Sequence, residues 1–369
     1  MCTITLDGYS YSEQTLLAQA ESVLNAENSP EWQKAVYRFI LQWLDSSPYI
    51  KVKTSGSTGA PKTIEVTKNA MCASAKLTQD YFGLKAGDRA LLCLSADYIA
   101  GKMMIVRALV SGLDLILVEP SAQPLSQLAY QPIKFAAFVP MQLEASLMQA
   151  DTAIRETCKR RLAAIDTVII GGSPMRPALC EVLSELDCKV YATYGMTETL
   201  SHIAVKRIDK HYQTQPLQLL PGIAINKDAR GCLVVDAPEL GVNKLVTNDM
   251  VEIENTEHFT VLGRIDNVIN TGSVKVFAEQ IEQKIAPLFG KSRFFIFAES
   301  DDKLHQRVSL LIEGEPLREA QLSALERAIA QKVKPYERPK TIRFLSAFIE
   351  TGSGKLDRLR SIEKLRLIH

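Results

Sequence analysis

Hydroxyl side chains, glycines and one lysine are concentrated in residues 54–62, Thr-Ser-Gly-Ser-Thr-Gly-Ala-Pro-Lys. Glycine lets a backbone approach a ligand closely, and hydroxyls, free N–H groups and an ammonium group are the donors that a polyphosphate needs. The alternative is a solvated hairpin loop. The P-loop pattern G-x-x-x-x-G-K-[ST] does not fit, because Pro61 separates the glycine from the lysine. The residues that could contact phosphate here are Thr54, Ser55, Gly56, Ser57, Thr58, Gly59 and Lys62.

Two further polar stretches follow apolar strand-like runs, which is where open α/β sheets bind ligands. The first is residues 171–173, Gly-Gly-Ser, for which a plain turn into a helix is the alternative. The second places Tyr194, Thr197 and Glu198 within five positions. A tyrosine ring can stack on a base, a threonine can bind a phosphate oxygen, and a carboxylate is a hard oxygen ligand of the kind Mg²⁺ takes beside substrate phosphates.

Two more stretches lie farther along the chain. In residues 247–249, Asp249 is placed to accept hydrogen bonds from vicinal hydroxyls, although a solvated turn explains the pattern equally well. Residues 350–355, Glu-Thr-Gly-Ser-Gly-Lys, present the lone Lys355 near the C-terminus. Most lysines of this kind are only solvated, so neither stretch identifies a site by itself.

The elements that must position these groups follow from hydrophobic periodicity. Strands at residues 49–53 and 63–66 flank the first stretch, and Thr67 is a plausible N-cap for a helix to about Tyr81. Alternating segments then predict an α/β fold whose sheet is covered by helices on both faces. The predicted strands are 90–94, 115–118, 136–139, 167–171 and 189–193, and the predicted helices are 99–110, 141–149, 155–164 and 174–186.

The pattern changes after Gly195. Residues 231–262 read as short strands and turns, which predicts a small β subdomain that closes the first unit. A separate α+β domain of about 100 residues follows, a normal size for one. We therefore expect a large domain over residues 1–264 and a small mobile C-terminal domain over residues 265–369.

Composition excludes several classes of protein. The net charge of +1, from 43 Lys and Arg against 42 Asp and Glu, creates no global field for nucleic acid or acidic membranes. Seven scattered cysteines without a C-x-x-C pair argue against a disulfide framework and a zinc site. Charged residues interrupt the longest apolar region, 90–118, and the N-terminus lacks signal-peptide character. We expect a cytoplasmic enzyme without nucleic-acid or membrane partners; the sequence leaves a homo-oligomer open.

Taken together, five stretches have the order and content of one family's motifs. They resemble the signatures of the adenylate-forming superfamily, which comprises acyl-CoA synthetases, adenylation domains and luciferases. The five stretches extend over nearly the whole chain. The resemblance is strong, because five accidental matches would each have to arise independently and in the same order. The matching stretches are residues 54–62 (T-S-G-[ST]-T-G-x-P-K), 194–198 (Y-G-x-T-E), 247–249 (T-G-D), 263–266 (G-R-x-D) and 351–358 (the end of P-x-T-x-x-G-K-x-x-R).

The chain also departs from the family pattern. Asn248 replaces the glycine of the third motif, and Glu350 stands where the last motif usually has proline. The first motif begins early, and this shortening is most similar to the o-succinylbenzoate–CoA ligases of menaquinone biosynthesis, especially a compact bacterial version. Residues 98–109 resemble that branch's H-x-x-G…R-x-L helix, with Tyr98 where a histidine is common.

The resemblance implies a two-step reaction with ATP and CoA as co-substrates and Mg²⁺ as cofactor. A carboxylate attacks the α-phosphate to give acyl-AMP and diphosphate, and the thiol then displaces AMP. Ser55, Ser57, Thr58 and Lys62 would hold the β- and γ-phosphates. The catalytic residues would be Thr197 on the α-phosphate, Glu198 on Mg²⁺, and Lys355 bridging the carboxylate and the α-phosphate.

The same resemblance implies an AMP site and a hinge. The AMP site would consist of an adenine slot at Gly171, Gly172, Ser173, Tyr194 and Gly195, and a ribose site at Asp249 assisted by Arg264. The C-terminal domain would close for adenylation and then rotate about Asp266, which brings the loop near residues 270–275 to face the site.

Residues for the acyl substrate are less constrained by pattern. A dicarboxylic keto acid needs a cation for its second carboxylate once that group is desolvated. Lys102 and Arg107 lie in the same apolar helix on different faces, so we expect at most one to point inward and prefer Lys102 beside Gly101. Surface snorkelling is the alternative for both. The acyl-site candidates are Tyr98, Gly101, Lys102, Ser201 and His202.

Other functions stay open at this point. Within the enzymes, another acyl-CoA or acyl-carrier-protein ligase of the superfamily is the alternative. From another class, a nucleotide-binding regulator without catalysis would also bind ATP, although the joint presence of Lys62, Glu198, Asp249 and Lys355 argues against it.

Overall fold

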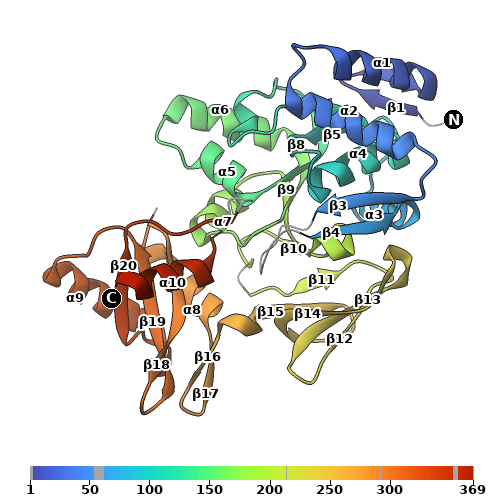
Figure 1. Cartoon of the computed structure of the whole chain (residues 1–369). Helices are drawn as coiled ribbons and strands as arrows, with labels where there is room; N and C mark the ends of the chain where they lie inside the picture. Colours follow the sequence, from blue (N-terminus) through green and yellow to red (C-terminus); the bar gives the residue numbers. More distant parts are fainter. Residues whose placement is uncertain (1–2, 54–61, 213, 291, 352–355, 369) are drawn as a thin grey trace.

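The computed structural model describes residues 3–53, 62–212, 214–290, 292–351 and 356–368. These residues form a 13-stranded sheet, a five-stranded sheet and a two-stranded hairpin. The large sheet and its helices occupy the N-terminal part of the chain, and the five-stranded sheet belongs to the C-terminal part (Figure 1). None of the helices in these ranges is long and apolar enough to cross a membrane.

The centre of the large sheet is parallel, as the alternating pattern predicts. Its strands, in spatial order, are β6 (Asp114–Leu117), β5 (Arg89–Leu92), β7 (Ile133–Phe138), β8 (Ile165–Ile170) and β9 (Lys189–Gly195). The sheet ends beyond β6 in β1 (Thr3–Leu6) and β2 (Tyr9–Ser12), which the sequence analysis did not foresee. Parallel strands buried on both faces read as continuous apolar runs, and this confirms the predicted α/β class.

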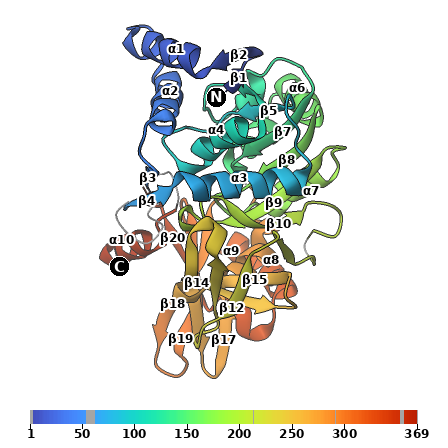
Figure 2. The same cartoon turned by 90° about the vertical axis from the view of Figure 1, so that its right-hand side faces the viewer.

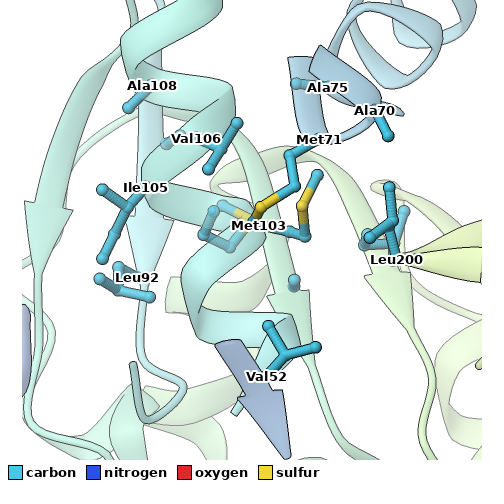
Figure 3. Packing of buried hydrophobic residues seen from close by; sticks show 14 of the residues in the cluster. Val52, Ala70, Met71, Ala75, Leu92, Met103, Ile105, Val106, Ala108 and Leu200 are labelled. Carbon is cyan, nitrogen blue, oxygen red and sulfur yellow. The ribbon is translucent and has the colours of Figure 1, made fainter. Parts of the chain in front are cut away.

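Helices cover both faces of this sheet through two separate apolar cores. Successive residues such as Leu91 and Leu92 point to opposite cores, because strand side chains alternate. One core takes in α1 (Glu13–Asn25), α2 (Glu31–Leu44), α3 (Lys68–Phe82) and α4 (Ile99–Ser111). The other takes in α5 (Pro140–Leu147), α6 (Thr152–Ala163) and α7 (Pro177–Ser184). In Figure 3, Met71 of α3 lies against Met103 of α4 within the first core.

The expected N-cap at Thr67 is confirmed, because its hydroxyl accepts a hydrogen bond from the Ala70 N–H at 3.1 Å. Thr67 also ends the hairpin of β3 (Tyr49–Lys53) and β4 (Thr63–Thr67). Helix α7, however, does not begin at Pro174 as predicted. Arg176 is held extended at φ −71° and ψ 144° because it precedes Pro177, and Pro177 then starts the helix.

The predicted small β subdomain is not a separate sheet. Strand β10 (His202–Arg207) pairs antiparallel with β9, and β11 (Leu217–Leu219) joins β10 to β15 (His258–Arg264), so one hydrogen-bonded sheet runs through both regions. Strand β14 is 12 residues long and bends at register shifts, and its length was not foreseen. These strands are β10 (His202–Arg207), β11 (Leu217–Leu219), β12 (Ala224–Lys227), β13 (Cys232–Ala237), β14 (Val242–Ile253) and β15 (His258–Arg264).

The C-terminal part has its own sheet and cores. Its strands are β16 (Val268–Thr271), β17 (Val274–Phe277), β18 (Phe294–Asp301), β19 (His305–Glu313) and β20 (Thr341–Leu345). Its helices are α8 (Ala278–Ile285), α9 (Glu319–Lys332) and α10 (Arg358–Ile368). Helices α8 and α9 pack on one core, while α10, which the sequence analysis missed, contributes Leu365 to the other. In Figure 2 the C-terminal strands lie below the parallel strands of the large sheet, at the level of its strands β12, β14 and β15, and we keep residues 1–264 and 265–369 as the proposed domains.

Candidate active site

The carboxyl ends of β8 and β9 lie side by side and carry two of the predicted stretches. Gly171 follows β8, and a Cβ there would collide with the Thr193 hydroxyl of β9. Gly172 has φ +91°, a conformation that favours glycine. Ser173 follows in the same exposed turn. Backbone therefore stays uncovered beside β9, as an adenine slot requires.

Tyr194 and Asp249, 55 residues apart in sequence, meet directly. The Tyr194 hydroxyl donates to Asp249 Oδ2 at 2.6 Å, and Arg264 Nη1 lies 3.4 Å from Asp249 Oδ1. Burial, followed by the neighbouring carboxylate, raises the pKa of Tyr194, so the phenol remains a donor. Each carboxylate oxygen keeps a lone pair free, so the Asp249 carboxylate can still accept from two vicinal hydroxyls.

The same chain of contacts reaches the predicted hinge. Asp266 lies in a short 3₁₀ turn, η4 (Ile265–Asn267), between β15 and β16. Its carboxylate accepts from Arg264 Nη2 at 3.2 Å and from Asn248 Nδ2 at 3.3 Å. The ribose-site candidate and the hinge candidate are therefore joined through Arg264.

Glu198 stands in a second 3₁₀ turn, η2 (Thr197–Thr199), directly after β9. Thr199 is fully buried and its hydroxyl accepts from the Met196 N–H at 3.0 Å, which holds the turn in place. Leu200 has φ +65°, unusual for a leucine, and its buried side chain retains it there. Glu198 is exposed and makes no ion pair with any described residue. Its free carboxylate fits the oxygen chemistry of Mg²⁺.

Beyond this turn lies a buried cation. Arg107 of α4 is 2% exposed, and no described carboxylate pairs with it. Its Nε donates to the Thr78 hydroxyl at 3.2 Å and its Nη2 to the Ser201 hydroxyl at 2.5 Å. Among the described residues, Nη1 reaches only Met104 Sδ, at 3.4 Å. Burial lowers the pKa of Arg107 to about 10, so the group is charged at neutral pH without a counterion among the described residues.

His202 extends this polar chain. The Ser201 oxygen accepts from Arg107, and its hydrogen can be donated to His202 Nδ1 at 3.2 Å. The neutral ring then carries its proton on Nε2, and that atom is buried with no hydrogen-bond partner among the described residues. The result is an unpaired buried donor beside a buried cation, and both groups have the chemistry to bind an anionic or carbonyl oxygen.

The buried state of His202 predicts a pH effect on stability. Burial and then the Arg107 charge lower the pKa of His202 to about 3, below its unfolded value of 6.5. The unfolded chain therefore binds more protons between these values, and stability falls as pH falls below 6.5. From pH 7 to pH 5 this group should cost about 2 kcal/mol.

Urea unfolding of the wild type and of His202→Gln at both pH values measures this effect. The variant should lack that part of the pH slope, whereas His211→Gln, at an exposed histidine, should retain it. Equal slopes in the wild type and His202→Gln would contradict a buried neutral imidazole.

The other acyl-site candidates lie at the start of α4. Gly101 allows close packing, since a Cβ there would strike the Ser95 carbonyl. Tyr98 precedes the helix and is 48% exposed. Lys102 is buried, but its Nζ lies 4.6 Å from the centre of the Phe39 ring of α2. The expectation that at most one of Lys102 and Arg107 points inward is wrong, because both side chains are buried. Of the two, Arg107 contacts Ser201, another acyl-site candidate.

The structure thus brings the predicted site residues together only in part. Tyr194, Asp249, Arg264 and Asp266 form one connected group, and Arg107, Ser201 and His202 form another. Gly195 joins them, because it pairs with His202 across β9 and β10 and a Cβ there would strike Ser201. Residues 54–59 and Lys355 lie outside the described residues, and Lys62 is the first described residue before β4.

The sequence analysis did not identify Thr78, which orients Arg107. A signal for it exists in α3, where Met71, Ser74, Ala75 and Thr78 form one buried stripe at helical spacing. A buried hydroxyl needs polar partners, and the Thr78 hydroxyl has two: it donates to the Ser74 carbonyl at 3.1 Å and accepts from Arg107 Nε.

Comparisons with known proteins add to this geometry. A family model described as "AMP-binding enzyme" matches residues 11–238. A probable 2-succinylbenzoate–CoA ligase of Mycobacterium tuberculosis is 26% identical over 341 residues, covering 87% of this chain and 85% of that protein. The 2-succinylbenzoate–CoA ligase of Enterococcus faecalis is 24% identical, covering 85% of this chain and 69% of that protein.

Solved structures give the same fold. An o-succinylbenzoate coenzyme A synthetase from Bacillus subtilis, in complex with ATP and magnesium ion, has a TM-score of 0.70 at 19% identity and covers 85% of this chain and 69% of that one. An AMP-forming acyl-CoA synthetase/AMP-acid ligase II-like protein from Dyadobacter fermentans is 36% identical with a TM-score of 0.61, covering 97% of this chain and 99% of that one. The chain therefore belongs to the AMP-binding enzymes of the adenylate-forming superfamily.

Proposed function

We propose that this adenylate-forming enzyme is an o-succinylbenzoate–CoA ligase. It would convert o-succinylbenzoate, ATP and CoA into o-succinylbenzoyl-CoA, AMP and diphosphate through an acyl-adenylate. The observation that carries the choice of substrate is the buried, uncompensated Arg107 beside Ser201 and His202. The names of the curated relatives support the same substrate.

Charge balance is the reason for this choice. An o-succinylbenzoate molecule has two carboxylates, and only one of them is activated. The second would be desolvated in the acyl pocket and needs a cation with free donors. Arg107 Nη1 has only a thioether as its described acceptor, so that edge of the guanidinium is available. A monocarboxylic fatty or aryl acid would leave the Arg107 charge unbalanced.

Adenylation brings two anions together and therefore depends on cations and positioned donors. The loop at residues 54–62 would hold the β- and γ-phosphates, and Thr197 the α-phosphate. Asp249 and Arg264 would orient the ribose, and Lys355 would neutralise charge between the attacking carboxylate and the α-phosphate. Rotation about Asp266 would then expose the acyl-adenylate to the CoA thiol.

Glu198 would hold Mg²⁺ together with the phosphates of ATP. When bound, the ion supplies positive charge to the phosphate oxygens. The 3₁₀ turn, held by the buried Thr199, fixes the backbone that carries Glu198, which supports this role.

Asp249→Asn is expected to raise the KM for ATP by about 10- to 100-fold, because one ribose acceptor becomes a donor and the Arg264 contact loses its charge. The KM for CoA should stay nearly unchanged. Steady-state kinetics with each substrate varied in turn measures both values. Asp236→Asn, on the neighbouring strand β13, is the control and should leave both constants at wild-type values. An unchanged KM for ATP in Asp249→Asn would contradict the ribose role.

A panel of acids tests the proposed substrate. AMP formation is measured with o-succinylbenzoate, fatty acids and aryl acids, each with CoA. The highest kcat/KM is expected for o-succinylbenzoate. A higher value for a monocarboxylic acid would indicate another acyl-CoA ligase. If none of the acids yields AMP with the wild type, the protein would be a nucleotide-binding regulator.

A further inference from the structure

Two backbone segments flank residues 352–355, and they are tied to each other. The Asp357 N–H donates to the Ile349 carbonyl at 2.8 Å, and Glu350 pairs with Leu356 in an antiparallel bridge. The Ile349 N–H donates to the Ser361 hydroxyl of α10 at 2.9 Å. Lys355 comes directly before Leu356 in the sequence, and these contacts hold the described residues on both sides of the segment 352–355.

A bidentate ion pair anchors the second of these segments. Arg358, three residues after Lys355, donates from Nη1 to Glu282 Oε1 and from Nη2 to Glu282 Oε2, both at 2.7 Å. Only 24% of the Arg358 side chain and 17% of the Glu282 side chain are exposed. The Arg358 guanidinium also lies 5.3 Å from the centre of the Phe295 ring.

The partner of Arg358 is itself rigidly placed. Glu282 belongs to α8, whose Ile281 and Ile285 are fully buried in the core of the C-terminal sheet. Glu282 Oε1 also accepts from the Ile296 N–H of β18 at 2.7 Å. The ion pair thus connects the first residue of α10 to both a helix and a strand of that core.

We propose that Glu282 and Arg358 are positioning residues that fix the direction in which the chain presents Lys355 to the reacting phosphate. This inference rests on the adenylation role proposed for Lys355. A lysine side chain is long and has many rotamers, so an accurate position for its ammonium group requires a fixed backbone. A parallel pair of charge-assisted hydrogen bonds fixes orientation as well as distance.

The test separates positioning from stability. A double variant, Glu282→Leu with Arg358→Met, removes both charges together, so neither is left buried and unpaired. It should remain folded but lose about 100-fold in acid-dependent ATP–diphosphate exchange, a loss typical of a reacting group misplaced by about 1 Å. Thioester formation from supplied acyl-adenylate and CoA should fall by less than about 3-fold, since Lys355 serves the first step.

The matched control lies on the same helix. Lys284 and Glu337 form an ion pair at 2.8 Å, and neither side chain has a hydrogen bond or ion pair with the described residues 349–351 and 356–358. Lys284→Met with Glu337→Gln should leave both half-reactions within about 2-fold of wild type. A folded Glu282→Leu, Arg358→Met enzyme that keeps wild-type exchange, or that loses both half-reactions equally, would overturn the proposal.

Amide hydrogen exchange measures the anchoring of this segment without depending on which carboxylic acid is the substrate. Exchange at the Asp357 N–H should be at least 10-fold faster in the Glu282→Leu, Arg358→Met enzyme and unchanged in the control. Unchanged protection of Asp357 would overturn the anchoring role. If the wild type activates another acid but not o-succinylbenzoate, the proposed substrate fails alone, and the comparison of variants is made with the accepted acid.

Discussion

Lys355→Ala is expected to lower acid-dependent ATP–diphosphate exchange by about 10³-fold while leaving thioester formation from supplied acyl-adenylate within about 10-fold of wild type. The difference arises because adenylation brings a carboxylate to a phosphate, and the ammonium group stabilises the charge that develops between them. In the second step a neutral acyl carbon is attacked and no such encounter occurs. Stopped assays of the two half-reactions measure the two losses separately.

The control for this prediction is Lys340→Ala, an exposed lysine of the same part of the chain. It should leave both half-reactions at wild-type values. Equal losses in both half-reactions of Lys355→Ala would show that the lysine supports folding or general binding and would contradict its role in adenylation.

Arg107→Met should remove most of the preference for o-succinylbenzoate. Truncating one partner of a buried charge pair costs about 2–5 kcal/mol, so kcat/KM for this acid should fall by about 30- to 5,000-fold. The folded protein should not become less stable. The pKa of Arg107 is lowered to about 10 by burial, so its charge opposes folding at neutral pH, and methionine relieves that cost.

Lys102→Met is the matched control, because it removes a second buried cation from the same helix α4. The Lys102 ammonium lies over Phe39 rather than beside Ser201, so kcat/KM for o-succinylbenzoate should change by less than about 3-fold. The account would be contradicted if Lys102→Met lost as much activity as Arg107→Met. It would also be contradicted if Arg107→Met kept the wild-type preference among acids.

Local signals predicted much of the fold. The strand β3 has its predicted bounds, and α3 begins after the predicted cap, because alternation and capping are encoded by adjacent residues. The joining of the β-rich region to the large sheet was missed, since β11 is only three residues long and pairs with strands distant in sequence. The false start of α7 came from reading Pro174 as its first residue, although a second proline follows at Pro177.

The candidate site, like the fold, was predicted from sequence only in part. Sequence motifs identified Tyr194, Asp249 and Arg264, and the structure supplies the contacts that connect them. Motifs could not choose between Lys102 and Arg107, because the choice depends on which neighbours each side chain meets. Phe39 comes from α2 and Ser201 from the turn after β9, and only tertiary packing places them near α4.

AMP release tests most directly whether this enzyme ligates o-succinylbenzoate to CoA through an acyl-adenylate. Purified enzyme is incubated with Mg²⁺, ATP and o-succinylbenzoate, with and without CoA, and AMP and thioester are quantified. With CoA, multiple turnovers should release AMP and o-succinylbenzoyl-CoA in equal amounts. Without CoA, diphosphate should form in an amount close to that of the enzyme while the adenylate stays bound. A wild type that releases no AMP in the presence of CoA would contradict the account.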